Sequence, residues 1–326
     1  MGLRVHFYKL DFPEYIDEFK SRLDPDIQIT EGKNIPSDAN FQVLVYPTPN
    51  RAWIEASPAL KALVIPWAGI PQKTRELMLD YPDITVHNLH HNKYNTAEFG
   101  LALLLAAAKH IVPMDQALRK NDWRPRYQSP YPLLLRDQTI LILGFGEIGE
   151  ALARYCLGLG MKVLGVKKHP EHYDGDLDVE LFGDDQLVEL LPRAEILALC
   201  LPHTDETHHL IGKNEIQAMP KGGILVNIGR GPVVVQGDLF EALKSGHLRA
   251  AASDVWYNYP QNVNDRKDTP PSDYPFGELE NFVLTPHIGG MADKAEQQCA
   301  EALAELLNAA NRNQPIPNKV DLRSGY

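Results

Sequence analysis

The sequence of 326 residues is poor in cysteine, in excess positive charge and in long apolar runs. Its 32 Lys and Arg residues are outnumbered by 43 Asp and Glu residues, which gives a formal net charge of −11 at pH 7. Nucleic acids and anionic membranes attract proteins that carry an excess of Lys and Arg, so neither is an expected partner. A few Arg side chains or backbone amides would still suffice to bind a small anion.

The cysteines and the apolar segments argue against an exported or membrane protein. Cys156, Cys200 and Cys299 are odd in number and lack the spacing of metal ligands, so we expect buried thiols in a reducing compartment. The first residues lack the apolar core of a signal peptide. The most apolar run, 101–112, is too short to span a bilayer. We therefore expect a cytoplasmic protein.

Short apolar runs alternate with amphipathic segments along most of the chain, which predicts βαβ units, parallel sheets and an α/β fold. The length allows about two domains that each bury a core. The expected strands are 3–8, 42–46, 62–66, 84–87, 139–144, 162–166, 196–201, 224–228, 250–255 and 282–285. The expected helices are 15–22, 73–81, 148–159, 185–191, 213–218, 238–244 and 292–311.

Two further segments stand out. One long helix is expected from residue 96 to about residue 120, because its first half is apolar on nearly all sides. Such a helix is typical of a buried connection between domains or of a dimer interface. Residues 257–277, with several Pro, Asp and Asn residues, are expected to form a long loop, and loops of that length are often functional or mobile.

A Gly-rich turn carries the clearest chemical signal. It follows one predicted strand, opens a helix and is followed by a second strand, which is the setting of a dinucleotide-binding turn. The pyrophosphate would lie at the positive N-terminal end of that helix. Gly144 permits a tight turn, and Gly146 lets the pyrophosphate approach the backbone closely. Gly149 lets the helix and the strand pack closely against each other. A purely structural turn is the alternative. The residues are Gly144, Phe145, Gly146, Glu147, Ile148 and Gly149.

The residues after the second of these strands bear on the choice of dinucleotide. NAD-binding proteins carry Asp or Glu there, which binds the ribose 2′-hydroxyl. This chain instead has Lys167, Lys168 and His169. Two cations suit a 2′-phosphate, so NADP(H) is expected in preference to NAD(H). A solvated basic turn that accepts either dinucleotide is the alternative.

Four further segments follow the Gly-rich turn in order. They are LPHTDET at 201–207, NIGRGP at 227–232, SDVW at 253–256 and TPHIGG at 285–290. Together with the Gly-rich turn they resemble the D-isomer-specific 2-hydroxyacid dehydrogenase family over about residues 60–300. The first sixty residues share only the alternation of strands and helices with that family.

This resemblance implies an architecture of two doubly wound parallel-sheet domains. A Rossmann dinucleotide-binding domain, 94–290, would be inserted into a flavodoxin-like substrate domain made of 1–93 and 291–326, with the active site in the cleft between them. In related proteins the helix 96–120 and the arm 121–135 supply the dimer interface, so the resemblance implies a homodimer.

The chemistry of 2-keto-acid reduction assigns roles to two residues. The reaction needs a hydride donor, a cation for the substrate carboxylate and an acid for the developing alkoxide. Arg230 suits the carboxylate and can polarise the carbonyl group. His287 suits the acid because its pKa lies near working pH. The resemblance implies the same roles. A surface ion pair for Arg230 and a core histidine for His287 are the alternatives.

The resemblance also implies contacts with a small anionic carboxylate substrate and with the dinucleotide. The loop 65–70 would bind the carboxylate through the backbone amides of Ala68 and Gly69. Trp67 would either form a wall of the substrate pocket or pack beneath the loop. Beyond the Gly-rich turn and the two lysines, the residues expected to contact the dinucleotide are Leu201, Pro202, Thr207, Ile228, Gly229, Asp254, His287 and Gly289.

The chain departs from the family at Tyr259. Most members carry a Glu at this position that hydrogen-bonds the catalytic His, and a carboxylate there would raise the pKa of His287, which a neutral phenol cannot do by charge. We still expect His287 to act as acid and base, with reduction fading as the pH rises through about 6.5. The formate dehydrogenases of the family also have a neutral residue here. Oxidation of a small anion such as formate or phosphite is therefore one alternative function, and a dinucleotide-sensing, corepressor-like binding protein is another.

The histidines do not predict a metal site. His87, His90 and His91 lie close together in the sequence, but no Asp, Glu or Cys accompanies them at ligand spacing. No metal is therefore expected. The histidines of segment 203–209 are expected to be exposed.

Overall fold

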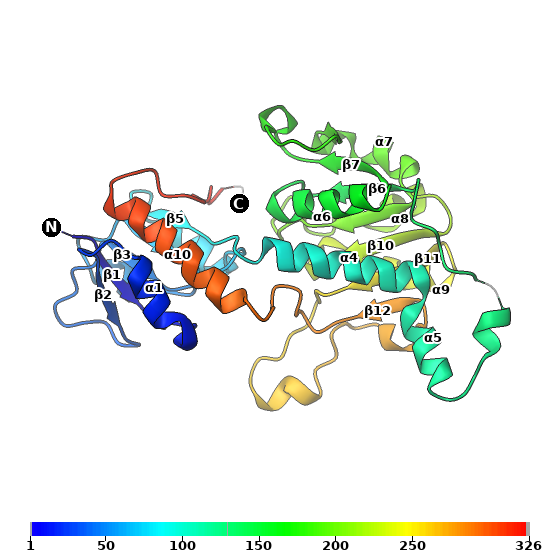
Figure 1. The fold of residues 1–326 in the computed structure, drawn as a ribbon, viewed down its shortest axis with the longest axis horizontal. Coiled ribbons are helices and arrows are strands. Elements are labelled where there is room, and N and C mark those ends of the chain that lie inside the picture. Colours follow the sequence, from blue (N-terminus) through cyan, green and yellow to red (C-terminus); the bar gives the residue numbers. More distant parts are fainter. Residues whose placement is uncertain (1, 129, 324–326) are drawn as a thin grey trace. The chain divides into compact units, whose positions relative to one another are not determined.

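The computed structural model describes residues 2–128 and 130–323. The chain divides into two compact units (Figure 1). The first combines the N-terminal segment up to Asn92 with the C-terminal segment from Met291, and the second is Lys93–Gly290. Each unit is built on one sheet whose strand ladders are all parallel among the described residues. The predicted α/β class is confirmed.

The sheet of the first unit has the strand order β2-β1-β3-β4-β5, which is the flavodoxin-like doubly wound order. Helices α1 and α10 lie side by side on one face, while α2 and α3 pack on the other. The elements are β1 Arg4–Phe7, η1 Pro13–Tyr15, α1 Ile16–Arg22, β2 Gln28–Glu31, β3 Val43–Val45, α2 Arg51–Glu55, β4 Ala62–Val64, α3 Gln72–Met78, β5 Thr85–His87 and α10 Ala295–Asn311.

The sheet of the second unit has the order β12-β11-β10-β9-β6-β7-β8, in which the direction of winding reverses between β6 and β9. Ligands of such sheets bind at this switch point, beyond the carboxyl ends of the strands. The strands are β6 Thr139–Leu143, β7 Lys162–Val166, β8 Glu180–Phe182, β9 Ile196–Leu199, β10 Gly223–Asn227, β11 Leu248–Ser253 and β12 Phe282–Leu284.

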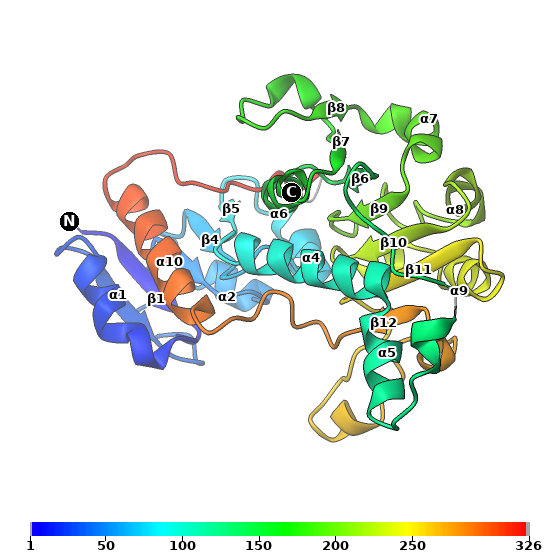
Figure 2. The ribbon, with the colours of Figure 1, turned by 45° about the vertical axis from the view of Figure 1, so that its right-hand side comes forward.

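Helices cover both faces of this second sheet. Helices α4 and α6 lie against each other on one face, as Figure 2 shows, and α7, α8 and α9 pack on the other. The helices are α4 Lys93–Lys109, α5 Ile111–Leu118, α6 Glu147–Gly158, α7 Leu187–Leu190, α8 Lys213–Ala218 and α9 Gln236–Lys244. The 3-10 turns are η2 Arg124–Tyr127, η3 Pro170–His172, η4 Asp184–Gln186, η5 Leu191–Arg193, η6 Gly231–Val233, η7 Asn264–Lys267 and η8 Phe276–Glu278.

The single long helix expected over 96–120 is wrong. The chain forms two helices that bend by 62° at His110, whose φ of 53° is left-handed. Pro113 explains the break, because proline lacks an N–H and its ring clashes with the carbonyl four residues earlier. That carbonyl belongs to Lys109, the last residue of α4. Pro113 is tolerated in the first turn of α5, where no partner for an N–H is required.

Two strands escaped prediction, and both lie at sheet edges. β2 has the sequence QITE and is largely exposed, and β8 has the sequence ELF. Both bury little of their surface, unlike the edge strands β5 and β12, so they lack the apolar pattern from which strands were predicted.

The apolar and charged features of the sequence have clear places in the fold. Among the described residues, no single helix is long and apolar enough to cross a bilayer, and α4 with α5 meets that test only as a bent pair.

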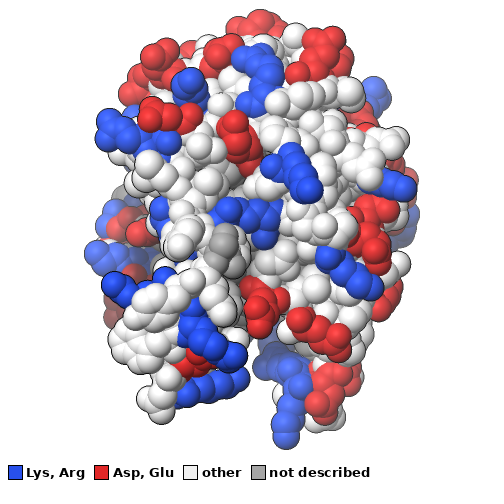
Figure 3. All heavy atoms as spheres, turned by 90° about the vertical axis from the view of Figure 1, so that its right-hand side faces the viewer, with Lys and Arg blue, Asp and Glu red and all other residues white. Residues whose placement is uncertain are grey.

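Cys156 is buried, whereas Cys200 and Cys299 are only partly buried. Acidic and basic side chains are interspersed on the face of the molecule drawn in Figure 3.

Candidate active site

The Gly-rich turn has the shape of a phosphate cradle. Gly144 has a φ of 92°, which favours glycine, and a side chain on Gly149 would come within 2.3 Å of the Gly144 carbonyl oxygen. A Cβ on Gly146, by contrast, would meet nothing within 4 Å. This open face lies at the first residue before α6, whose first turn has no side-chain cap. These residues therefore fit a dinucleotide pyrophosphate at the N-terminus of α6.

Two other residues of the Gly-rich turn have roles inside the second unit. The Phe145 ring is buried against Tyr173, so only its backbone faces the turn. The Glu147 carboxylate forms an ion pair with Lys93 and links the starts of α6 and α4.

The basic turn after β7 is partly neutralised. Lys167 Nζ donates to the Phe145 carbonyl at 3.3 Å and lies over the Tyr173 ring. Lys168 Nζ forms an ion pair with Glu206, 2.9 Å away. The two lysines therefore lie beside the Gly-rich turn, and a carboxylate from another loop accompanies the second of them.

The loop after β9 is held by two buried threonines. Thr204 N donates to Thr207 Oγ1 at 2.8 Å, and Thr207 Oγ1 donates to the Pro202 carbonyl at 2.7 Å. The Thr207 hydroxyl thus has a partner within the loop. This rigid turn holds the exposed acids Asp205 and Glu206 at its tip.

Arg230 projects from the turn after β10. Buried Asn227 fixes this turn, because its side chain accepts from Gly229 N and donates to the Arg230 carbonyl, each at 3.0 Å. A Cβ on Gly229 would lie 2.4 Å from the Leu201 carbonyl, so this position requires glycine. Arg230 Nη1 donates to the Gly229 carbonyl, and burial lowers the pKa of the guanidinium.

His287 occupies a strained turn after β12, with a left-handed φ of 58°. The carboxylate of Asp254, which is 3% exposed, holds this turn. It accepts from Thr285 Oγ1 at 2.7 Å, from Ile288 N at 3.0 Å and from Gly289 N at 2.7 Å. These three bonds position His287, and the expected contact of Asp254 with the dinucleotide stays a prediction.

Tyr259 lies beside His287, with 5.5 Å between ring centroids. Its hydroxyl oxygen accepts from Trp256 N at 3.0 Å. Burial raises the pKa of this phenol, which the Trp256 hydrogen bond and nearby Arg230 partly offset. Tyr259 is therefore neutral at physiological pH.

The charges around His287 oppose its protonation. Desolvation of part of the ring and the positive charge of Arg230 lower the pKa of the imidazole below its usual value, and Asp254 offsets this only in part, although the residue as a whole is exposed. This direction favours a fading of reduction at a lower pH than the expected 6.5, which stays a prediction.

The loop expected to bind the substrate carboxylate belongs to the first unit. Trp67 is 40% exposed, and the loop carbonyls of Trp67 and Ala68 accept from Leu89 N and from Asn88 Nδ2. None of the described hydrogen bonds uses the N–H groups of Ala68 or Gly69, which suits them as donors to an anion.

The histidines near residue 90 do not form a cluster of ligands. His87 is buried and bonds the Pro317 carbonyl and Thr85 Oγ1. The histidines of segment 203–209 are exposed, as expected. A different set of metal-ligand type was not anticipated: His169, Glu171 and His172 lie together on the surface beside the basic turn.

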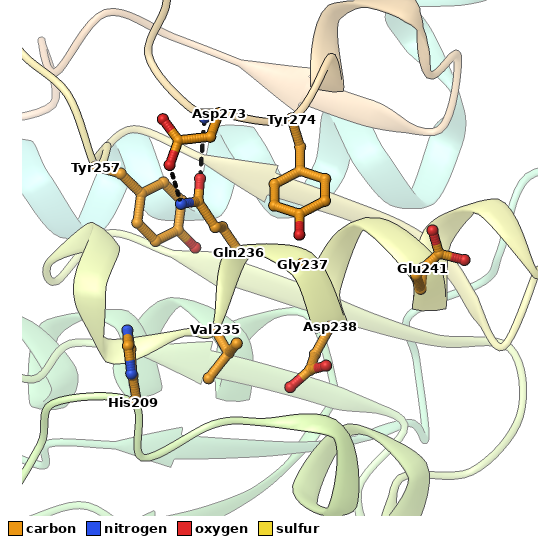
Figure 4. A pocket seen from close by; sticks show the side chains of 9 residues that line it. All are labelled: His209, Val235, Gln236, Gly237, Asp238, Glu241, Tyr257, Asp273 and Tyr274. Atoms are coloured by element: carbon orange, nitrogen blue, oxygen red, sulfur yellow. Dashed lines mark hydrogen bonds between the residues drawn. The ribbon is translucent and has the colours of Figure 1, made fainter.

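A surface cavity of about 680 Å³ lies elsewhere in the second unit (Figure 4). Carboxylates of Asp238, Glu241 and Asp273 line it, together with the rings of Tyr257 and Tyr274, and no Lys or Arg is among its lining residues. None of the predicted site residues lines this cavity. Its negative charge does not suit a carboxylate substrate or a dinucleotide.

Residues 101–289 match the profile described as D-isomer specific 2-hydroxyacid dehydrogenase, NAD binding domain. The chain belongs to this family. Within the family, it is 36% identical over 230 residues to a glyoxylate reductase of Korarchaeum cryptofilum, covering 69% of this chain and 65% of that protein. It is also 30% identical over 271 residues to a D-3-phosphoglycerate dehydrogenase of Methanocaldococcus jannaschii, covering 82% and 49%. These matches span less than two thirds of either relative.

A solved member of the family shares the fold over its full length. It is a D-isomer specific 2-hydroxyacid dehydrogenase from Xanthobacter autotrophicus in complex with NADPH and MES. The TM-score is 0.80 at 24% identity, and the match covers 100% of both chains.

Two residues that position side chains of this site were not predicted from the sequence. Asn227 opens the NIGRGP segment, and its position before a Gly-Arg turn was the available signal. Glu206 is part of the LPHTDET segment, but its pairing with Lys168 across 38 residues left no local pattern.

Proposed function

We propose that the protein is an NAD(P)-dependent 2-hydroxyacid dehydrogenase that reduces a small 2-keto acid. The observation that carries the proposal is the grouping of Arg230, Tyr259 and His287 at the carboxyl ends of β10, β11 and β12. These ends lie on the same edge of the sheet as the Gly-rich turn. The names of the relatives, glyoxylate reductase and phosphoglycerate dehydrogenase, support a small 2-keto or 2-hydroxy acid as substrate.

The roles follow from charge and position. The dinucleotide, when bound, supplies or accepts the hydride. The half-buried Arg230 guanidinium, oriented through Gly229, binds the substrate carboxylate and polarises its carbonyl. Protonated His287 donates the proton to the alkoxide oxygen, and Asp254 keeps its turn in place.

The dinucleotide site would be formed by the Gly-rich turn, by the lysines after β7 and by the loops after β9, β10 and β12. The open face of Gly146 and the α6 N-terminus support the pyrophosphate position. Lys167 and Lys168 support a 2′-phosphate and hence a preference for NADP(H). Ala68 and Gly69 are proposed as donors to the carboxylate, and Trp67 as a contact of the substrate side chain.

The proposal is tested by following reduced-nicotinamide absorbance with NADPH or NADH and a panel of keto acids that includes glyoxylate and hydroxypyruvate. We expect turnover with at least one acid. Arg230→Met should lower kcat/KM by roughly 10²–10³-fold while leaving dinucleotide affinity within about threefold. Arg193→Met, which removes a surface guanidinium paired with Glu180, is the matched control.

Oxidation of formate or phosphite is the second candidate, because Tyr259 places a neutral group beside His287. Formate loses hydride directly to give carbon dioxide and needs no acid, whereas phosphite must also gain an oxygen from water, whose proton a base accepts. Formate- or phosphite-dependent reduction of NAD(P), with no keto-acid turnover, would favour it. Tight dinucleotide binding with no turnover at all would favour the sensing protein.

We also propose a homodimer. None of the residues of helix α5 is buried. Large apolar side chains on this helix and on the arm that follows expose more than a third of their surface. They include Ile111, Leu118, Trp123 and Tyr127. The arm expected over 121–135 includes residue 129, which lies outside the described residues. The double change Trp123→Ser and Tyr127→Ser should halve the mass measured by light scattering.

A further inference from the structure

We propose that Glu206 sets the choice between NADPH and NADH by competing with a 2′-phosphate for Lys168. The inference rests on the proposed function, because it presumes that the second unit binds a dinucleotide. Glu206 lies in the loop after β9, whereas the preference for NADP(H) was predicted from Lys167 and Lys168, which follow β7.

The topology places this ion pair across the switch point. In the sheet, β6 lies between β7 and β9, and all three strands run parallel. The Gly-rich turn follows β6, Lys168 follows β7 and Glu206 lies in the loop after β9. A contact between Lys168 and Glu206 therefore bridges the loops on either side of the Gly-rich turn, at the place where such sheets bind dinucleotides.

Lys168 and Glu206 are within ion-pair distance, and hydrogen bonds in the loop after β9 hold the Glu206 backbone. Lys168 Nζ lies 2.9 Å and 3.2 Å from the two carboxylate oxygens of Glu206. The buried hydrogen bonds between Thr204 and Thr207 keep the Glu206 backbone in place. Because the glutamate side chain is 63% exposed, the pair is modest in strength and open to exchange.

Charge gives the direction of the effect. A 2′-phosphate carries more negative charge than the Glu206 carboxylate and would take Lys168 as its partner. Glu206 would then lie near the phosphate as a like charge, which opposes binding. NADH, which has only a hydroxyl there, leaves the ion pair undisturbed. Glu206 therefore reduces the increase in affinity for NADPH that Lys168 provides.

The test is a set of dissociation constants for NADPH and NADH, measured by calorimetry without substrate. Glu206→Gln should lower the dissociation constant for NADPH about two- to fivefold and that for NADH by less than twofold, the range expected for an exposed ion pair. Asp205→Asn removes an equal charge from the neighbouring residue and serves as the matched control. It should change the NADPH constant by less than Glu206→Gln does.

A double-mutant cycle isolates the pair. In a Lys168→Met background, Glu206→Gln should change NADPH affinity by less than it does in the unmodified chain, because only the like-charge repulsion is then relieved. Equal effects of Glu206→Gln and Asp205→Asn in the unmodified chain would overturn the inference and leave the proposed function standing. Weaker NADH binding in Glu206→Gln would also overturn it, because Glu206 would then bind the ribose hydroxyl. If the unmodified protein binds neither dinucleotide, the proposed function and the inference both fall.

Discussion

Replacing Tyr259 with Glu should move the pH dependence of keto-acid reduction to higher pH. Reduction requires protonated His287, so its rate falls as the pH rises through the pKa of that group. In the unmodified protein, partial burial and Arg230 hold this pKa below 6.5, and Asp254 opposes them. The falling limb of kcat/KM should therefore lie below pH 6.5.

The separation of the rings sets the size of the effect. A negative charge about 5.5 Å from the imidazolium interacts with it by about 3 kcal/mol at an effective dielectric constant of ~20. That corresponds to about 2 pKa units, and exposure of both groups to solvent reduces it to roughly 1 unit. The sign is unambiguous, because a carboxylate stabilises the protonated form of His287. The limb in Tyr259→Glu should thus move up by about one pH unit.

The assay is kcat/KM for reduction between pH 4.5 and 8.5, paired with an NMR titration of the His287 ring. Tyr259→Phe is the matched control, since it keeps the ring, loses the hydrogen bond from Trp256 N and adds no charge. Its limb should stay within a few tenths of a pH unit of the original. Coincident limbs in all three proteins, each shown to be folded, would refute the assignment of the limb to His287.

Three further changes follow from single contacts. Asp254→Asn removes the charge from the acceptor that holds the His287 turn, and we expect kcat in turnover assays to fall by roughly 10–100-fold with dinucleotide affinity nearly unchanged. Gly149→Ala drives a methyl group toward the Gly144 carbonyl and should abolish dinucleotide binding in calorimetry or prevent folding. Burial lowers the pKa of His91 to about 4 in the folded protein. Below about pH 6.5 the unfolded chain therefore binds more protons than the folded one, so the free energy of unfolding decreases as the pH falls from about 6.5 to 4. Chemical denaturation of His91→Gln should show a shallower loss over that range.

The core of the fold was predictable because its strands bury both faces and are apolar throughout. The runs at β6 and β7 have the sequences TILIL and KVLGV, and the predicted bounds there differ from the observed ones by no more than a residue. The polar edge strands β2 and β8 gave no such signal. The helix break at His110 was not predicted, because the apolar pattern continues as far as Pro113, whose clash with the preceding turn ends α4.

The site was predictable where motifs carry its chemistry and not where distant contacts do. Arg230 and His287 were selected from their segments, and both lie at the carboxyl edge of the second sheet. The hydrogen bonds from residues 285–289 to Asp254 and the pairing of Lys168 with Glu206 join residues 31 to 38 positions apart. Such pairings depend on strand order, which the local sequence does not encode.

One group must govern both directions of the reaction, and this separates the candidate functions. Neutral His287 accepts the proton in hydroxy-acid oxidation and protonated His287 returns it in reduction, so both limbs reflect the same pKa in the free enzyme. Oxidation should rise through the pH at which reduction falls, and Tyr259→Glu should move both limbs together. Formate oxidation transfers no proton to His287 and would show no such limb. Paired limbs therefore support the keto-acid reductase, while a flat oxidation profile that Tyr259→Glu leaves unchanged supports the oxidation of formate.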